Sequence, residues 1–166
     1  MPKSDQEIHS NRYMLIPRTL ILVIRGDEVL LIKGGPRKRL WANLYNGIGG
    51  HIERGEDVIT AARRELKEEA GLIVADLCLV GTILVDASDS TGVGIYVMRG
   101  NFIGGKTRSS EEGELEWVKM SDLDRLPLVE DLKIILRRMM SMRTSDAPFS
   151  ARSYYDADDR LQVLFG

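Results

Sequence analysis

The sequence has few residues of several types, and cysteine is the scarcest. A single cysteine, Cys78, stands among 166 residues, so no disulfide can form within the chain. Proteins of oxidising compartments commonly depend on disulfides, whereas cytoplasmic proteins rarely contain them. We therefore expect a reducing environment and a cytoplasmic location. Because Cys78 lies in the apolar run 73–80, we also expect a buried structural thiol rather than a nucleophile.

Long hydrophobic runs and an excess of charge are also absent. No run approaches the roughly 20 apolar residues of a membrane-spanning helix, and the polar start of the chain, MPKSDQEIHSN, lacks the hydrophobic region of a signal peptide. The net charge is −2 and the isoelectric point about 5.8. Neither value favours binding to a nucleic-acid polymer, and we expect a small-molecule ligand and no membrane partner. The length suits one well-buried core rather than two ordinary domains.

Strand and helix patterns alternate along the chain. Turn residues Gly26 and Asp27 separate two apolar segments, which predicts a β-hairpin formed by 18–25 and 29–33. The remaining pattern predicts strands over 77–86, 94–99 and 115–120, a glycine-rich loop over 100–113, helices over 57–70 and 128–142, and a hairpin within 152–165. These elements predict an α/β (α+β) fold, a three-layer α/β/α sandwich with a mixed β-sheet. We expect a polar lead over 1–16, a main domain over 17–142 and an extension over 143–166 that packs on it.

The predicted helix over 57–70 carries three glutamates on one side, Glu65, Glu68 and Glu69, which are three and four residues apart. Glu65 and Glu69 fall beside the apolar stripe of this helix rather than on its solvent side. Gly71 suits a left-handed cap at the end of the helix. The apolar stripe consists of Ile59, Ala62, Leu66 and Ala70, and the solvent side of Thr60, Arg63 and Lys67.

Glutamates held this close repel each other. At about 6 Å and an effective dielectric constant near 20, one pair costs roughly 2–3 kcal/mol. A solvated acidic face is the alternative explanation of such a cluster, but Arg63 and Lys67 occupy the solvent side. Arg64 can pair with Glu68 and relieve part of the repulsion, and a divalent cation would relieve more. Oxygen ligands select hard ions such as Mg²⁺ or Mn²⁺, whereas His51 alone offers too little nitrogen ligation for zinc.

Residues 50–72 resemble the Nudix box at every fixed position: Gly50, Glu56, Arg64-Glu65-Leu66, Glu68-Glu69 and Gly71-Leu72. The similarity extends from about residue 17 to 140. It implies a Nudix-type fold and a hydrolase that cuts a nucleoside diphosphate linked to a further group, with Mg²⁺ or Mn²⁺ as cofactor. It further implies metal ligands, namely the Gly49 carbonyl and the carboxylates of Glu53, Glu65, Glu68 and Glu69. Arg64 would orient a catalytic glutamate, and Glu56 would support the turn into the helix.

The hydrolysis needs such residues because a pyrophosphate resists attack by virtue of its own negative charge. Divalent ions neutralise that charge and lower the pKa of an attacking water. A carboxylate that is not fully used by metal can then accept the proton of the water. We expect Glu65 or Glu68 in this role, with Glu112 as a third candidate. Glu112 also resembles a late metal-facing glutamate of the family, although a solvated acidic loop explains it equally well.

Residues 44–50 resemble the entry to the box in the Nudix branch that destroys oxidised purine nucleoside triphosphates. In that branch an asparagine, here Asn46, faces the base, and an acidic pair, here Glu130-Asp131, precedes the last helix. A protonated carboxyl of this pair could donate to a base carbonyl. Asn46 is equally consistent with a simple turn, and the acidic pair with favourable charge at a helix N-terminus. Lys33 and Arg37 complete the expected substrate contacts, though the basic loop can also be merely solvated.

We therefore expect a Mg²⁺-dependent pyrophosphohydrolase, a monomer or homodimer, that converts a nucleoside triphosphate such as 8-oxo-dGTP to monophosphate and pyrophosphate. Hydrolysis of ADP-ribose, a nucleotide sugar or a dinucleoside polyphosphate is the alternative within the family, and non-catalytic nucleotide binding is a more remote one. Residues 100–107 also match the P-loop pattern GxxxxGK[ST]. Because β-prone residues rather than a helix follow them, we do not expect a phosphate-binding loop there.

Overall fold

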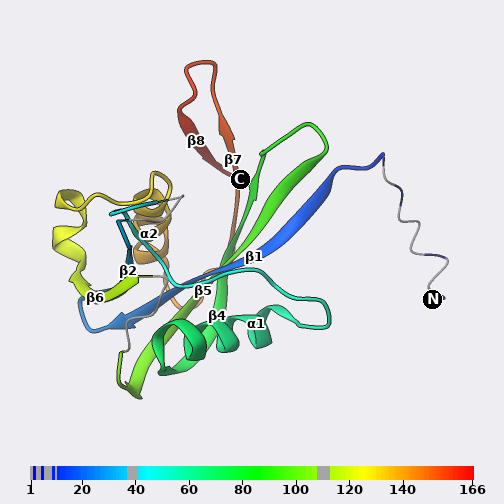
Figure 1. Cartoon of the computed structure of the whole chain (residues 1–166). Coiled ribbons are helices and arrows are strands. Elements are labelled where there is room, and N and C mark those ends of the chain that lie inside the picture. Colours follow the sequence, from blue (N-terminus) through cyan, green and yellow to red (C-terminus); the bar gives the residue numbers. More distant parts are fainter. Residues whose placement is uncertain (1, 3–4, 6–8, 10, 37–40, 108–112) are drawn as a thin grey trace.

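The computed structural model describes residues 2, 5, 9, 11–36, 41–107 and 113–166. Within these residues, eight strands form one sheet in the order β3-β2-β1-β5-β4-β7-β8, and β6 pairs with β2 (Figure 1). β1 runs parallel to β5 and β4 runs parallel to β7, whereas the other pairs are antiparallel, so the sheet is mixed. The strands are β1 (Met14–Arg25), β2 (Glu28–Gly34), β3 (Tyr45–Asn46), β4 (Leu72–Val85), β5 (Thr91–Gly105), β6 (Gly113–Lys119), β7 (Phe149–Tyr155) and β8 (Leu161–Phe165).

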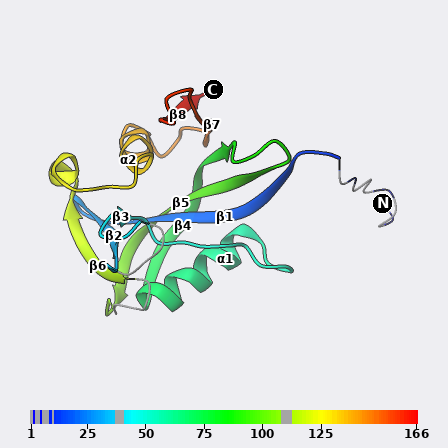
Figure 2. The same cartoon turned by 45° about the horizontal axis from the view of Figure 1, so that its top comes forward.

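Helices lie on both faces of the sheet (Figure 2). On one face, α1 (Val58–Glu65) continues as a π-helical segment, η2 (Leu66–Ala70). On the other face lies α2 (Leu132–Met140), which follows a short 3-10 helix, η3 (Met120–Arg125). Side chains alternate along β1, so that Ile21 and Val23 join the core beneath α1 while Leu20 and Leu22 join the core beneath α2. The predicted α/β/α sandwich with a mixed sheet is confirmed.

The second helix begins later than its apolar pattern predicts. Its buried stripe is confirmed, because Leu132, Ile135, Leu136 and Met139 are all buried. The helix starts at Leu132 rather than at residue 128, because the preceding backbone pairs with Tyr45. The Tyr45 N–H donates to the Pro127 carbonyl, and the Val129 N–H donates to the Tyr45 carbonyl, both at 2.9 Å. This pairing fixes the start of α2 beside β3.

The predicted loop over 100–113 is wrong in its first half, because β5 continues to Gly105. Asn101, Phe102, Gly104 and Gly105 pair with residues 72–75 at the start of β4, and a register shift skips residue 103. Gly100 allows this pairing, since a Cβ at this position would come within 3.0 Å of Val74 on β4. The P-loop pattern therefore begins inside a β-strand rather than in a loop.

The expectation of a buried Cys78 is also wrong. The thiol is exposed and free. A register shift in β4 between Ala75 and Cys78, together with a left-handed backbone at Asp76 (φ 53°), resets the alternation of buried and exposed side chains. Hydrophobicity of the run 73–80 alone could not locate this irregularity.

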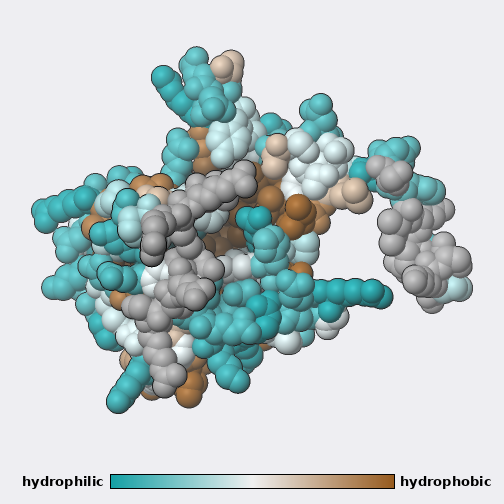
Figure 3. Space-filling view, viewed as in Figure 1, coloured by the Kyte–Doolittle hydropathy of each residue, from teal (hydrophilic) through white to brown (hydrophobic). Residues whose placement is uncertain are grey.

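The chain ends in the predicted hairpin, formed by β7 and β8, and β7 adds to the sheet beside β4. At this outer end of the sheet, Leu15, Ile16 and Leu84 are exposed. Figure 3 shows hydrophobic surface between the outer half of β1 and this hairpin, whereas hydrophilic residues cover the molecule over α1. The hydrophobic surface beside the hairpin thus contrasts with the hydrophilic surface over α1, the helix that carries the glutamates.

Candidate active site

The helix that carries the glutamates is bounded as its sequence predicts. The Asp57 carboxylate caps its start by accepting from the N–H groups of Ile59 at 2.8 Å and Thr60 at 3.0 Å. Gly71, with φ of 64°, ends it in the left-handed conformation. The last turn, over Leu66–Ala70, is π-helical rather than α-helical, and such turns frequently occur at functional sites. Glu65 is buried at 8% exposure, whereas the Glu68 side chain is 61% exposed.

Arg64 links the helix to the loop that precedes it. Its Nε and Nη2 donate to the two carboxylate oxygens of Glu56 at 2.8 and 2.9 Å, a bidentate ion pair. Its Nη1 donates to Glu65 at 2.7 Å and to Glu68 at 3.2 Å, and Nη2 also donates to the His51 carbonyl at 3.0 Å. Hydrogen bonds from Arg64 and from the backbone of Glu53 lower the pKa of Glu56 to about 2. Arg64 therefore holds the Glu65 carboxylate and the loop in one arrangement.

The glycines of the loop let it lie between β1 and the helix. The N–H groups of Ile21 and Thr19 on β1 donate to the carbonyls of Ile48 at 2.7 Å and Gly50 at 2.8 Å. Gly49, with φ of 145°, has a backbone that favours glycine, and its N–H donates to Glu69 at 3.2 Å. A Cβ on Gly50 would lie 2.5 Å from Oε1 of Glu65. The loop and the two carboxylates are thus in direct contact.

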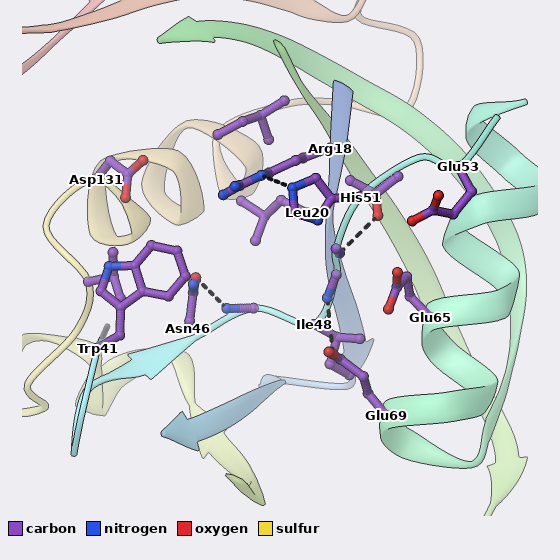
Figure 4. A pocket seen from close by; sticks show the side chains of 16 residues that line it. Arg18, Leu20, Trp41, Asn46, Ile48, His51, Glu53, Glu65, Glu69 and Asp131 are labelled. Atoms are coloured by element: carbon purple, nitrogen blue, oxygen red, sulfur yellow. Dashed lines mark hydrogen bonds between the residues drawn. The ribbon is translucent and has the colours of Figure 1, made fainter. Parts of the chain in front are cut away.

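A cavity of about 470 Å³ opens beside this contact. In Figure 4, Glu53, Glu65 and Glu69 lie at one end, and Trp41, Asn46 and Asp131 lie at the other. The volume is in the range of small-molecule sites. The described residues that line it are Arg18, Thr19, Leu20, Trp41, Asn46, Gly47, Ile48, Gly49, Gly50, His51, Glu53, Glu65, Glu69, Ile95, Val129 and Asp131.

The acidic end has the donor chemistry of a hard divalent cation. Carboxylates of Glu53, Glu65 and Glu69 line it, and the Gly49 carbonyl takes no part in the backbone bonds that tie the loop to β1. No three His, Cys, Asp or Glu side chains of the described residues form a ready-made metal cage. Mg²⁺ does not need one, because it commonly binds through one or two carboxylates together with waters and substrate phosphates. The residues at this end therefore fit Mg²⁺ or Mn²⁺.

The other end has a mixed polar and aromatic lining. Oδ1 of Asn46 accepts from the Gly47 N–H at 2.8 Å, which is turn chemistry, while the amide lines the cavity. Desolvation by burial raises the pKa of Asp131, and its side chain makes no capping hydrogen bond at the start of α2. Glu130 is exposed and does not line the cavity. Trp41, 44% exposed, borders the opening.

The structure does not bring every predicted residue to the cavity. Glu68 lies outside its lining, and so does Lys33, whose ammonium lies over the Tyr45 ring at 5.5 Å from the centroid. Arg37 and Glu112 lie outside the described residues. Sequence reasoning also missed lining residues, namely Arg18, Leu20, Ile95 and Val129. These come from three separate segments, and no local motif marks them.

Comparison with known proteins identifies the family to which the chain belongs. Residues 14–139 match the NUDIX domain. The oxidized purine nucleoside triphosphate hydrolase of Danio rerio is 34% identical over 110 residues, which cover 66% of this chain and 67% of the relative. The NAD-capped RNA hydrolase NudC of Pseudomonas aeruginosa is 30% identical over 128 residues, which cover 77% of this chain but only 44% of that protein. A mutator MutT protein from Bacillus halodurans has a similar fold, with a TM-score of 0.76 and 24% identity over 91% of this chain and 97% of its own.

The chain belongs to the NUDIX family and is a hydrolase. The resemblance that residues 50–72 carry is confirmed, including the relation to the oxidised-purine branch. Among the described residues, no helix has the length and hydrophobicity needed to cross a membrane.

Proposed function

We propose that this protein hydrolyses a nucleoside triphosphate, such as 8-oxo-dGTP or a similar oxidised purine nucleotide, to the monophosphate and pyrophosphate. One observation carries the proposal: a single cavity has carboxylates at one end and an amide, a carboxyl and an indole at the other. The first end suits cation-bound phosphates, and the second suits a purine base. Relatives that are 33–34% identical and are described as oxidized purine nucleoside triphosphate hydrolases support the same assignment.

At the phosphate end, Glu53, Glu65, Glu69 and the Gly49 carbonyl would hold Mg²⁺ or Mn²⁺. The bound cation would neutralise phosphate oxygens and lower the pKa of the attacking water. Glu65 supports the role of proton acceptor best, because it lines the cavity while Arg64 fixes one of its oxygens at 2.7 Å. Glu68, the other candidate, is exposed and outside the cavity, so we assign it an electrostatic role through Arg64.

At the base end, Asp131 is the proposed donor to a base carbonyl. A carboxyl can donate only when it is protonated, and burial raises the pKa of Asp131 in that direction. The Asn46 amide, whose oxygen is held by Gly47, can present its NH₂ group to an acceptor on the purine. The Trp41 indole at the rim offers a stacking surface. Together these groups match the pattern of donors and aromatic surface that a purine needs.

The relation to NudC favours a second candidate, hydrolysis of the pyrophosphate in a dinucleotide such as NAD. The matched residues cover 44% of that relative. The cavity has one end lined by Trp41, Asn46 and Asp131, so we rank a mononucleotide above a dinucleotide.

A product-resolved turnover panel tests the proposal. It comprises 8-oxo-dGTP, the four canonical deoxynucleoside triphosphates, ADP-ribose, a nucleotide sugar, a dinucleoside polyphosphate and NAD, each with Mg²⁺ and with EDTA. We expect 8-oxo-dGTP to give the highest kcat/KM, with pyrophosphate as a product and no turnover in EDTA. Preferred cleavage of NAD or ADP-ribose would replace the proposed substrate, and absence of triphosphate cleavage would refute it.

A further inference from the structure

Arg18 lines an acidic cavity, and no carboxylate among the described residues forms an ion pair with it. It is the one Lys or Arg side chain among the described residues of the lining, which also includes Glu53, Glu65, Glu69 and Asp131. No ion pair joins it to a described residue. Its Nε donates instead to Nε2 of His51 at 3.2 Å. Arg18 is a partly buried residue, and a guanidinium that no described carboxylate pairs is available to an anionic group of a ligand.

Arg18 lies between the two ends of the cavity. Arg18 and His51 face each other across a β-bridge, and His51 directly follows Gly50, which contacts the Glu65 carboxylate. Figure 4 shows the guanidinium of Arg18 extending from His51 toward Asp131, between the two ends of the cavity. In a nucleotide, the group between the base and the terminal phosphates is the ribose with its α-phosphate. Only the phosphate carries charge.

We infer that Arg18 binds the α-phosphate of the substrate and determines the preference of the site for nucleotides over nucleosides. The inference rests on the proposed nucleotide hydrolysis. Nε of Arg18 donates to His51, and neither Nη group donates to a described residue, so both can donate to two phosphate oxygens. This contact needs no metal, so it holds the monophosphate portion independently of the cation at the carboxylates.

His51 acts on the substrate through Arg18 and is a positioning residue. Its Nε2 accepts from Arg18, while its backbone carbonyl accepts from Arg64 at 3.0 Å. The same residue therefore connects the guanidinium of the cavity to the network that holds Glu65. Without the imidazole acceptor, the long Arg18 side chain would sample more rotamers and bind phosphate less tightly.

The test is calorimetric titration of the protein in EDTA with 8-oxo-dGMP and, separately, with the nucleoside 8-oxo-deoxyguanosine. The wild type should bind the monophosphate about 10- to 100-fold more tightly than the nucleoside, the value of a charged hydrogen-bond pair. Arg18→Gln should remove this ratio and leave nucleoside affinity unchanged. His51→Ala should reduce the ratio in part, and His51→Gln, which keeps an acceptor, should restore it. Arg63→Gln, which removes an exposed charge outside the cavity, is the matched control and should change neither affinity.

Three results would overturn the inference. The first is a wild type that does not prefer the monophosphate, and the second is an Arg18→Gln variant that keeps the preference. The third is an Arg18→Gln variant whose affinity for the nucleoside falls as much as its affinity for the monophosphate. The last result would make Arg18 a base contact or a support of cavity shape. These outcomes are separable from failure of the proposed function, which is read from wild-type turnover in the substrate panel. Normal turnover combined with an unchanged ratio in Arg18→Gln removes the role of Arg18 alone.

Discussion

Gly50→Ala places one methyl group against the residue proposed to accept the proton. The added Cβ would lie 2.5 Å from Oε1, 2.9 Å from Cδ and 3.1 Å from Oε2 of Glu65. Gly50 does not adopt a left-handed backbone, so alanine meets no conformational barrier of its own. The carboxylate must therefore retreat by roughly 1 Å to reach ordinary contact. The same oxygen, Oε1, accepts from Arg64 at 2.7 Å, so the retreat also perturbs this hydrogen bond.

The expected consequence is a large loss of activity with a small loss of stability. A displacement of this size in a reacting group lowers kcat by about 100-fold, while overpacking of one methyl costs about 1–3 kcal/mol of unfolding free energy. Steady-state kinetics on the preferred substrate of the panel, together with urea denaturation, measure the two effects separately.

Gly104→Ala is the matched control, because a Cβ on Gly104 meets no atom within 4 Å and its backbone is also not left-handed. This variant should keep the kcat of the wild type. If Gly50→Ala also kept it, the contact between the loop and Glu65 would not matter for the reaction. A fall in kcat that only paralleled the unfolded fraction would equally refute the reasoning.

Three further predictions follow from the same site. Glu56→Gln should lower the free energy of unfolding near neutral pH, because the pKa of Glu56 in the folded protein is lowered to about 2. Urea titrations should show that the difference in unfolding free energy between variant and wild type disappears as the pH falls from about 5 toward 2. The KM of the wild type should rise as the pH increases through the raised pKa of Asp131, because ionisation removes the hydrogen-bond donor. Asp131→Asn should abolish this pH dependence, and an equal dependence of KM on pH in both proteins would refute the donor role. Lys106→Ala should leave turnover unchanged, because the P-loop pattern begins within β5. Loss of turnover would instead support a phosphate-binding role for this pattern.

Local features of this molecule were predictable from sequence. The apolar spacing of the helix, its Asp57 cap and Gly71 place its bounds, and the same spacing puts Glu65 beside the buried stripe. The π-helical last turn was not predictable, because it depends on how the helix end meets β4 and the loop. It separates Glu68, which is exposed, from Glu65, although both occupy one side of an ideal α-helix.

Features that depend on contacts between distant segments escaped sequence reasoning. The start of α2 is set by two backbone hydrogen bonds, from Tyr45 to Pro127 and from Val129 to Tyr45, which override the helical pattern. Arg18 reaches the cavity only because β1 bridges to His51, 33 positions later. The exposure of Cys78 follows from an irregular pairing of β4 with β5. Local composition contains none of this information.

The central claim is that the carboxylates beside the loop hold a divalent cation. Calorimetric titration with Mn²⁺, in the absence and presence of a nucleoside triphosphate, tests it most directly on the wild type, on Glu65→Gln and on Glu114→Gln, whose exposed glutamate lies outside the cavity. We predict saturable Mn²⁺ binding that Glu65→Gln weakens by about 10-fold or more and that Glu114→Gln leaves unchanged. Absence of Mn²⁺ binding to the wild type with and without nucleotide, or equal binding to all three proteins, would contradict the account.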